Sequence, residues 1–564
     1  MGEGRARTPL FSRPLVPAVL ILGILAGLAA AGRCFFSGPI DCSLGWMRFS
    51  CTTAERPLLI SLISAVLLVS VLIRRGWFSR PSPTAWAWGL GGVALLWSAF
   101  YGGVGVYLHR TWRSSSLDMA LHSQILWNIL RGRFLESSFF EHNFAANHFW
   151  PGLCLLAPVY GVFGNEGMIV LQAAVVAFGA FGVYLLGRLI AGSRRWAWAG
   201  AITYLLHPTL TIGVLFDYHF ELFAVTPAVF GIYFLLRRRW WAAGAVIAAA
   251  VSLYEINAVP FMLAGLILAA RPGWRRPGLI LAAACAAYLV LLVEVIMPHF
   301  RYPGYFPHLD RFRKLGRTPW LMVKHFFSAP VAYLRRFATP FRLENLWYLL
   351  RSVGFVALLG AEWLLPVLPI VLGLYLSMYE LQIDIRVGYV APTLPFMLTA
   401  SFYGARRLFL LPGRLGGWIK AYGVVPFLAV TAASSLWMQF HRPFRENIFE
   451  PPPYRQLLAG AAALIPPRAS LSADNHIGPH FVERDILLVT PQVHFRNRPV
   501  DYIFTDFNTW GRKDRPYLWR LRRFLEEGRY GPIFFSGGVL VLKRGRLDPV
   551  RARRVLEYMN SRNL

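Results

Sequence analysis

Charge is scarce in this chain, and acidic charge is the scarcest. Only 15% of the 564 residues are charged, whereas 56% are hydrophobic. Several apolar runs approach the ~20 residues needed to cross about 30 Å of hydrocarbon. A soluble core of this size does not require such runs. The composition therefore excludes a soluble protein and predicts an α-helical polytopic membrane protein.

The shortage of acidic residues leaves a large basic excess. The chain has 28 Asp and Glu against 58 Lys and Arg, a formal net charge of +30. Such an excess could indicate nucleic-acid binding, but the basic residues form short clusters between apolar runs instead of one basic face. We expect no nucleic-acid partner. The clusters instead set the topology and contact membrane lipids.

The chain also lacks a clear cleavage site after its first apolar run, Leu15 to Ala31. We therefore interpret this run as a span, not a signal peptide, and place the N-terminus in the cytoplasm. The following loop then lies outside and holds Cys34, Cys42 and Cys51. A disulfide is chemically allowed there, but three cysteines cannot all pair with one another.

Alternation of apolar runs with Arg clusters predicts about 13 transmembrane helices. We expect two additional N-terminal helices in residues 1–80, a main transmembrane domain in 81–438 with an outer loop at 110–150, and a small domain in 439–564. The short run Leu153 to Phe163 is left over and is interpreted as re-entrant or interfacial. The predicted spans are 15–31, 57–73, 86–107, 166–190, 196–215, 222–236, two short passes in 240–270, 279–298, a hairpin in 346–378, 389–402 and 422–437.

The C-terminal part changes character. Strand-like pieces at Ile486 to Val489, Tyr502 to Thr505, Ile533 to Phe535 and Val539 to Leu542 alternate with a helical piece at Tyr517 to Glu527. These patterns predict a small α/β domain. Counting the spans places this domain on the extracytoplasmic side.

Polar residues interrupt the apolar pattern most densely between Ser114 and Pro151. The segment opens with a Ser run, continues as an amphipathic helix and ends among aromatics. An ionisable residue at membrane depth is costly unless it pairs, lines a wet cavity or has a function. By the predicted topology, polar groups converge at one outer face: Asp118 with His122, Glu141 with His148, Asp217 with His219 and Glu221, and Glu255 with Asn257.

Such a face favours a site, although carboxylate and His pairs can also simply satisfy each other. Asp118 is placed to act as general base toward a hydroxyl acceptor, while basic groups hold the phosphate of a lipid-linked donor. Metal binding is the rival role for Asp217, His219 and His148, on a generic spacing. We expect no metal and no cofactor, with a divalent metal left open.

Several motifs carry a family resemblance. LDMALHSQILWNILRGRF, NHFWPGLCLLAPVYGVFG, LFDYHFE, SLYEINAVPF and LSADNHIGPHFVERDILLVTP resemble an uncharacterised family of bacterial and archaeal predicted membrane proteins, domain of unknown function 2079. That family is similar to GT-C glycosyltransferases, which take sugars from polyprenyl-phosphate donors. The resemblance covers residues from about Ser114 to Gly545.

The resemblance implies a catalytic aspartate at Asp118. It implies accompanying motif positions at Gln124, Trp127 and His148, and further site candidates at Asp217 and His219. The family pattern has a Lys-Glu-Asp-like triplet where this chain has Tyr254, Glu255, Ile256 and Asn257. The missing lysine removes a phosphate contact, which Arg residues of the loop His299 to Asn345 can replace.

We therefore expect a GT-C-type glycosyltransferase in the inner membrane of a bacterial or archaeal cell. It would move a sugar from a polyprenyl-phosphate donor to a glycan, lipid or protein acceptor at the extracytoplasmic face. The alternative is a transporter or flippase of a lipid-linked or anionic substrate. The catalytic candidate is Asp118, and the substrate-binding candidates are His122, Gln124, Trp127, His148, Asp217, His219, Glu255 and Asn257.

Overall fold

The computed structural model describes residues 18–23, 26, 40–44, 47–51, 85–301, 308–316, 319–441, 454–509 and 515–561. Most of the two predicted N-terminal spans lies outside these residues, and so do the side chains that decide the expected cysteine pairing. The described part of that region includes an antiparallel pair of strands, β1 (Ile40–Leu44) and β2 (Met47–Cys51).

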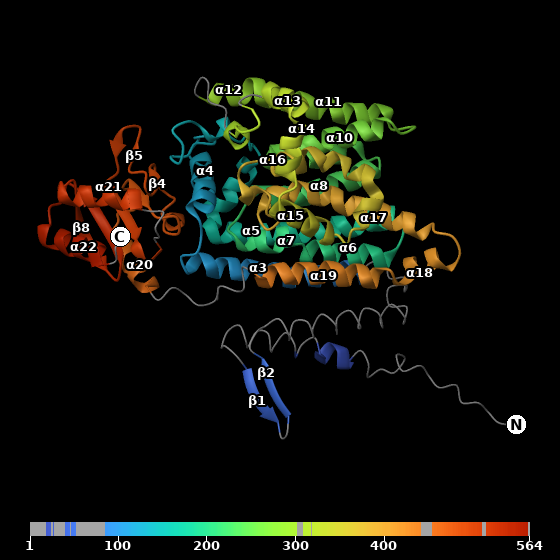
Figure 1. Ribbon diagram of the computed structural model, residues 1–564, viewed down its shortest axis with the longest axis horizontal. Coiled ribbons are helices and arrows are strands. Elements are labelled where there is room, and N and C mark those ends of the chain that lie inside the picture. Colours follow the sequence, from blue (N-terminus) through green and yellow to red (C-terminus); the bar gives the residue numbers. More distant parts are fainter. Residues whose placement is uncertain are drawn as a thin grey trace.

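The body of the protein is helical, and its helices run side by side along the long axis of the molecule (Figure 1). Apolar residues face inward and build one continuous core from Leu90 to Met438. The helices are α3 (Ala85–Arg110), α4 (Leu121–Ile129), α5 (Leu153–Ile190), α6 (Arg194–Leu206), α7 (Pro208–Leu215), α8 (Phe220–Leu236), α9 (Trp240–Leu253), α10 (Ala258–Ala269), α11 (Arg275–Leu291), α12 (Met297–Phe300), α13 (Pro319–Ser328), α14 (Pro330–Phe337), α15 (Pro340–Arg351), α16 (Leu368–Leu376), α17 (Leu394–Phe409), α18 (Arg414–Tyr422) and α19 (Val424–His441).

The expected count of 13 spans is not confirmed. Among the described residues, four helices are long and apolar enough to cross a membrane, or up to six if each bent pair counts as one span. The main difference lies at 346–378, where we predicted a hairpin. There α15 ends at Arg351, and a 3-10 segment, Val356–Trp363, meets the following helix at 78°. Apolar composition alone does not distinguish a span from short helices packed inside the protein.

Two predicted interruptions coincide with breaks in the structure. Between α9 and α10 the chain forms a 3-10 turn, Glu255–Asn257, at the expected site of the broken helix. Helix α5 is kinked at Gly164, whose φ of 59° and ψ of −156° are not helical. Only glycine adopts such a conformation readily. The kink separates the piece that begins at Leu153 from the long remainder of α5.

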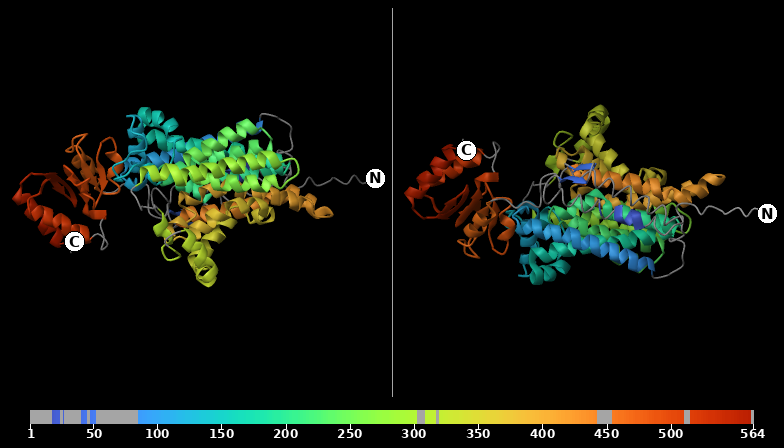
Figure 2. Two further views of the ribbon diagram at one scale, coloured as in Figure 1. Left: turned by 90° about the horizontal axis from the view of Figure 1, so that it is seen from above. Right: turned by 90° about the horizontal axis from the view of Figure 1, so that it is seen from below.

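The C-terminal part is an α/β domain, as predicted, and lies at one end of the helical body beside α4 (Figures 1 and 2). Its five-stranded sheet has the order β4-β3-β7-β9-β8, with β3 parallel to β4 and β7 and the remaining pairs antiparallel. The predicted strands and helix all form, whereas β3, the β5–β6 pair and two helices escaped prediction. The elements are α20 (Arg455–Ala462), β3 (Leu471–Ala473), β4 (Leu487–Val489), β5 (His494–Phe495), β6 (Arg498–Pro499), β7 (Tyr502–Asp506), α21 (Arg515–Glu526), β8 (Tyr530–Ser536), β9 (Val539–Arg544) and α22 (Pro549–Ser561).

The helical body and the C-terminal domain share a hydrophobic core. Met119 and Ile125 of the helical body belong to the same buried cluster as Leu471 and Phe504 of the sheet, each fully buried. A separate cluster around Leu521 and Val555 fills the other side of the sheet. The domain is thus docked through packed apolar side chains and is not merely tethered.

Candidate active site

The Asp118 segment forms a short π-helical turn, Ser116–Ala120, which leads directly into α4. The amphipathic helix predicted here is present, with Ile125 fully buried. Single turns of π-helix are rare and often occur at functional sites. This turn brings the Asp118 side chain to the wall of a cavity of about 520 Å³.

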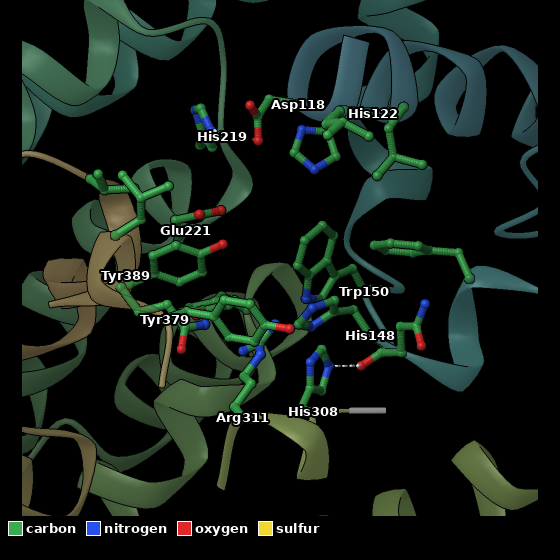
Figure 3. A pocket seen from close by; sticks show the side chains of 18 of the residues that line it. Asp118, His122, His148, Trp150, His219, Glu221, His308, Arg311, Tyr379 and Tyr389 are labelled. Atoms are coloured by element: carbon green, nitrogen blue, oxygen red, sulfur yellow. Dashed lines mark hydrogen bonds and ion pairs between the residues drawn. The ribbon is translucent and has the colours of Figure 1, made fainter. Parts of the chain in front are cut away.

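The cavity is lined by side chains from separate parts of the chain (Figure 3). The π-helical turn supplies Asp118, and α4 supplies His122. The loop before α5 supplies His148 and Trp150. His219 and Glu221 come from the start of α8. The opposite wall comes from segments around 310 and 380. The lining residues include Leu117, Asn147, Phe216, Tyr254, His308, Asp310, Arg311, Tyr379, Gln382 and Tyr389.

Asp118 and His219 form the central pair. His219 Nε2 lies 3.4 Å from Asp118 Oδ1, and 31% of the Asp118 side chain is exposed. Burial alone would raise the pKa of Asp118, but the hydrogen bond and charge of His219 outweigh this effect and lower it. Burial would likewise lower the pKa of His219, yet Asp118 and Glu221 raise it to about 9. At neutral pH the pair is a carboxylate beside an imidazolium.

Two other histidines of the cavity, His122 and His308, stay neutral. Burial, together with the charge of His219, lowers the pKa of His122 to about 3. Burial also lowers the pKa of His308 to about 3. The ring of His308 lies 3.3 Å from the carbonyl oxygen of Asn147 (Figure 3). A neutral imidazole can donate or accept one hydrogen bond to a sugar hydroxyl without adding charge.

Glu255 organises the wall beside the loop that precedes α5. Its carboxylate is buried and lies 2.6 Å from His148 Nδ1, and it also accepts a hydrogen bond from the indole N–H of Trp150. Glu255 itself lines a second, adjoining cavity of about 380 Å³. Both cavities share His148, Tyr254, His308 and Arg311.

The adjoining cavity differs in chemistry. Apart from the shared residues and Glu255, its wall is made mainly of aliphatic side chains: Ile256, Val259, Leu289, Leu292, Met297, Pro369, Ile370 and Leu374. Arg311 lies on the boundary between the polar and the apolar space. No carboxylate partner of Arg311 is present among the described residues. A cation is therefore available where a charged headgroup would join an apolar chain.

Of the expected substrate-binding residues, four line neither the cavity at Asp118 nor the adjoining cavity. Gln124 is fully buried and bonds Ser137, Ser138 and the carbonyl of Arg484. Trp127 lines a cavity on another face of α4. Asp217 accepts the backbone N–H of Ser115 at 2.6 Å, and Asn257 bonds carbonyl oxygens of its own turn. Gln124, Asp217 and Asn257 thus bond backbone groups, and Trp127 faces a different cavity.

Sequence reasoning missed much of the opposite wall. His308, Tyr379, Gln382 and Tyr389 come from irregular segments without periodicity. Arg311 belongs to the basic loop that we expected to replace the missing lysine. Among the residues that the structure describes, no group of three His, Cys, Asp or Glu side chains is arranged to hold a metal ion.

The C-terminal domain completes the turn that carries Asp118. The side-chain oxygen of Asn475 accepts the backbone N–H of Ser116 at 3.0 Å and lies 3.4 Å from that of Leu117. The backbone carbonyl of Asn475 accepts the Ser116 N–H at 2.7 Å. These N–H groups belong to the first turn and have no helical partner of their own. Asn475 thus acts as a cap supplied from another domain.

The similar solved structures include two of the same protein. ArnT from Cupriavidus metallidurans bound to undecaprenyl phosphate aligns over 82% of this chain and 98% of its own length, with 13% identity and a TM-score of 0.49. The apo state of the same protein aligns over 80% and 98%, with 13% identity and a TM-score of 0.44. No curated protein matches the chain.

The family resemblance, by contrast, is confirmed directly from the sequence. The family model described as "Predicted membrane protein (DUF2079)" matches residues 108–541, which include the Asp118 turn, the cavity and most of the C-terminal domain. The chain therefore belongs to the DUF2079 family of predicted membrane proteins.

Proposed function

We propose that the protein is a GT-C-type membrane glycosyltransferase that moves a sugar from a polyprenyl-phosphate donor to a hydroxyl acceptor. The observation that carries this proposal is the arrangement of three features around one space. A carboxylate, Asp118, faces a polar cavity, an apolar cavity opens beside it, and the cation Arg311 lies where the two meet. This order matches a donor made of a sugar, a phosphate and an apolar chain.

The proposed reaction exchanges one bond at the anomeric carbon of the sugar. The acceptor oxygen forms a bond to this carbon while the bond to the phosphate oxygen breaks. Asp118 takes the proton of the acceptor hydroxyl, and the polyprenyl phosphate leaves with its electron pair. Attack opposite to the leaving group inverts the configuration of the sugar carbon.

Each charged residue has one task in this scheme. His219 fixes Asp118 and keeps it ionised, so the base is ready but weak. A weak base suffices because the hydroxyl becomes acidic as it attacks an oxocarbenium-like carbon. Arg311 binds the donor phosphate and stabilises the charge that develops on the leaving group. Glu255 holds His148 and Trp150 in the wall that would contact the sugar.

We place the site at the extracytoplasmic face of a bacterial or archaeal cell membrane, with the N-terminus in the cytoplasm. Polyprenyl-linked sugars are membrane-bound, and the aliphatic cavity beside the polar one would hold the apolar chain of the donor. The acceptor would be a glycan, a lipid or a protein with a free hydroxyl near the membrane surface.

The test uses purified protein in lipid nanodiscs with a panel of radiolabelled polyprenyl-phosphate sugars and crude envelope acceptors. We expect transfer by the wild type and a loss of about a hundredfold in Asp118→Asn, because the proton acceptor is removed. Asp485→Asn, a change of the same type at an exposed carboxylate of the C-terminal domain, should leave transfer intact. Donor movement across proteoliposomes without transfer, unchanged in Asp118→Asn, would contradict the proposal and favour a transporter.

A further inference from the structure

A further cavity of about 750 Å³ lies between α4, the kink of α5 and the C-terminal domain. It shares no lining residue with the cavity at Asp118. Leu121 and His122, near the start of α4, face the catalytic cavity. Trp127, near the end of α4, and Arg131, just beyond the helix, line the further cavity. A ligand bound here does not meet Asp118, so this space needs its own explanation.

Arg484 is a buried cation in the wall of this cavity. Its side chain lines the cavity and is 3% exposed, yet no carboxylate partner is present among the described residues. Its Nε and Nη1 donate to the carbonyl oxygens of Phe481 and Ala469 at 2.7 and 2.6 Å. Burial lowers the pKa of Arg484 to about 10, so it remains charged at neutral pH. A buried cation without a counter-ion is costly, and an anion in the cavity would remove that cost.

Further guanidinium groups surround the same space. Arg131 lies 4.0 Å above the ring of Trp127, which orients it at the wall, and its link to Asp485 is a long 3.9 Å. Arg468 is exposed and has no carboxylate partner among the described residues. Of the two lining carboxylates, Glu166 is already paired with Arg110, which leaves Glu483 alone against these arginines. The cavity wall therefore carries an excess of positive charge.

We propose that this cavity is a second, non-catalytic binding site for a phosphate-bearing anion. Guanidinium groups suit phosphate because their planar N–H donors bind two of its oxygens at once. The phosphate can belong to a membrane lipid or be free. The rim favours the lipid: Phe163 lines the cavity and is 65% exposed, and its neighbour Val162 is 73% exposed. Both lie just before the kink in α5, where an acyl chain could pack against them.

The test measures phosphate binding directly and does not depend on sugar transfer. Wild-type protein in phosphatidylcholine nanodiscs is titrated with radiolabelled inorganic phosphate by equilibrium dialysis. In parallel, native mass spectrometry in detergent counts bound dioleoylphosphatidic acid against dioleoylphosphatidylcholine. Binding in both arms supports a general phosphate site, and binding of the phosphatidic acid alone supports a lipid headgroup site. Binding in neither arm overturns the proposal.

Variants assign the binding to this cavity. We expect Arg131→Gln with Arg468→Gln to weaken binding at least tenfold, and these partly exposed positions should not disturb folding. Arg484→Gln should weaken it further if the variant keeps the wild-type circular dichroism spectrum. Arg553→Gln, at an exposed arginine on α22 that does not line this cavity, should leave this binding unchanged. Equal binding in the double variant and the wild type would overturn the proposal.

Discussion

The side-chain oxygen of Asn475 accepts the backbone N–H of Ser116 at 3.0 Å, across the junction between the C-terminal domain and the helical body. Nearby, the two parts touch so closely that a Cβ atom on Gly478 would lie 2.1 Å from Ser116 Oγ. The Asp118 turn is therefore positioned by a domain that begins more than 300 residues later in the chain. The position of the Asp118 side chain in the cavity depends on that docking.

We expect Asn475→Ala to lower the turnover number for sugar transfer at least tenfold with little change in the KM for the donor. The reason is that the Leu117 N–H loses its side-chain acceptor and the Ser116 N–H keeps only the backbone carbonyl of residue 475. Even a small displacement of a catalytic group lowers the rate. Asn475→Asp keeps an acceptor oxygen and should recover most of the rate. Its added charge should raise the pKa of Asp118 and move the acidic limb of the pH profile upward.

A second change tests the same junction from the other side. Gly478→Ala should also lower turnover, because the added methyl group displaces Ser116. Asp485→Asn removes an exposed ion pair with Arg133 at the same interface and serves as the control. If Asn475→Ala and Gly478→Ala behave like this control in steady-state kinetics, the C-terminal domain does not position Asp118.

The Asp118–His219 pair predicts a pH dependence. The pKa of His219 is raised to about 9. The attraction between the His219 imidazolium and the Asp118 carboxylate therefore stabilises the fold fully below pH ~6.5 and is lost as the pH rises through 9. Transfer by the wild type should thus be level near neutral pH and fall above pH 9. His219→Gln removes the charge that lowers the pKa of Asp118, so its acidic limb should lie at higher pH than that of the wild type. Identical limbs in both proteins would exclude this coupling.

We expect the buried Asp217 to make the free energy of unfolding depend on pH. The sign is opposite to that of a salt-bridged carboxylate. Burial raises the pKa of Asp217 to about 7, so the folded protein holds this proton more tightly than the unfolded chain. Stability should fall as the pH rises from about 4 through 7, by an amount on the order of 4 kcal/mol. Asp217→Asn keeps an acceptor for the Ser115 N–H and should raise Tm at pH 8 but not at pH 4. An unchanged pH dependence of Tm would contradict the assignment.

We expect replacement of Arg311 to weaken binding of the donor. Arg311→Gln should raise the KM for the polyprenyl-phosphate donor about ten- to a hundredfold, because a charge-assisted hydrogen bond contributes about 1.5–3 kcal/mol. Arg313→Gln is the matched control, since this arginine lies two positions further along, is exposed and lines neither cavity. Equal KM values for both variants in the transfer assay would remove Arg311 from the donor site.

Parts of this site were predictable because polarity is conspicuous inside an apolar sequence. Asp118, His122, His148 and His219 each interrupt apolar surroundings, and all of them line the cavity. The broken helix at Glu255 was predictable for the same reason. Spacing does not, however, say where a side chain points. Asp217 adopts a positive φ of 72° and turns its carboxylate toward Ser115, away from the cavity.

The opposite wall could not be predicted from the sequence. Tyr379 and Tyr389 flank a 3-10 turn between α16 and α17, where no period of two or 3.6 residues exists. The predicted number of spans is not confirmed, for a related reason. Helices α9 and α10 have the apolar composition of a span but only 14 and 12 residues, fewer than the ~20 that a crossing needs.

The shared core of the two parts has a consequence for how the protein is made. Residues 454–541 are synthesised after the helical body, yet they supply Leu471 and Phe504 to the cluster beneath Met119, and Asn475 to the turn of Asp118. Until this late segment has emerged and folded, the start of α4 lacks both its cap and part of its apolar support. A chain interrupted before this point would carry the Asp118 turn without its cap and without part of its core.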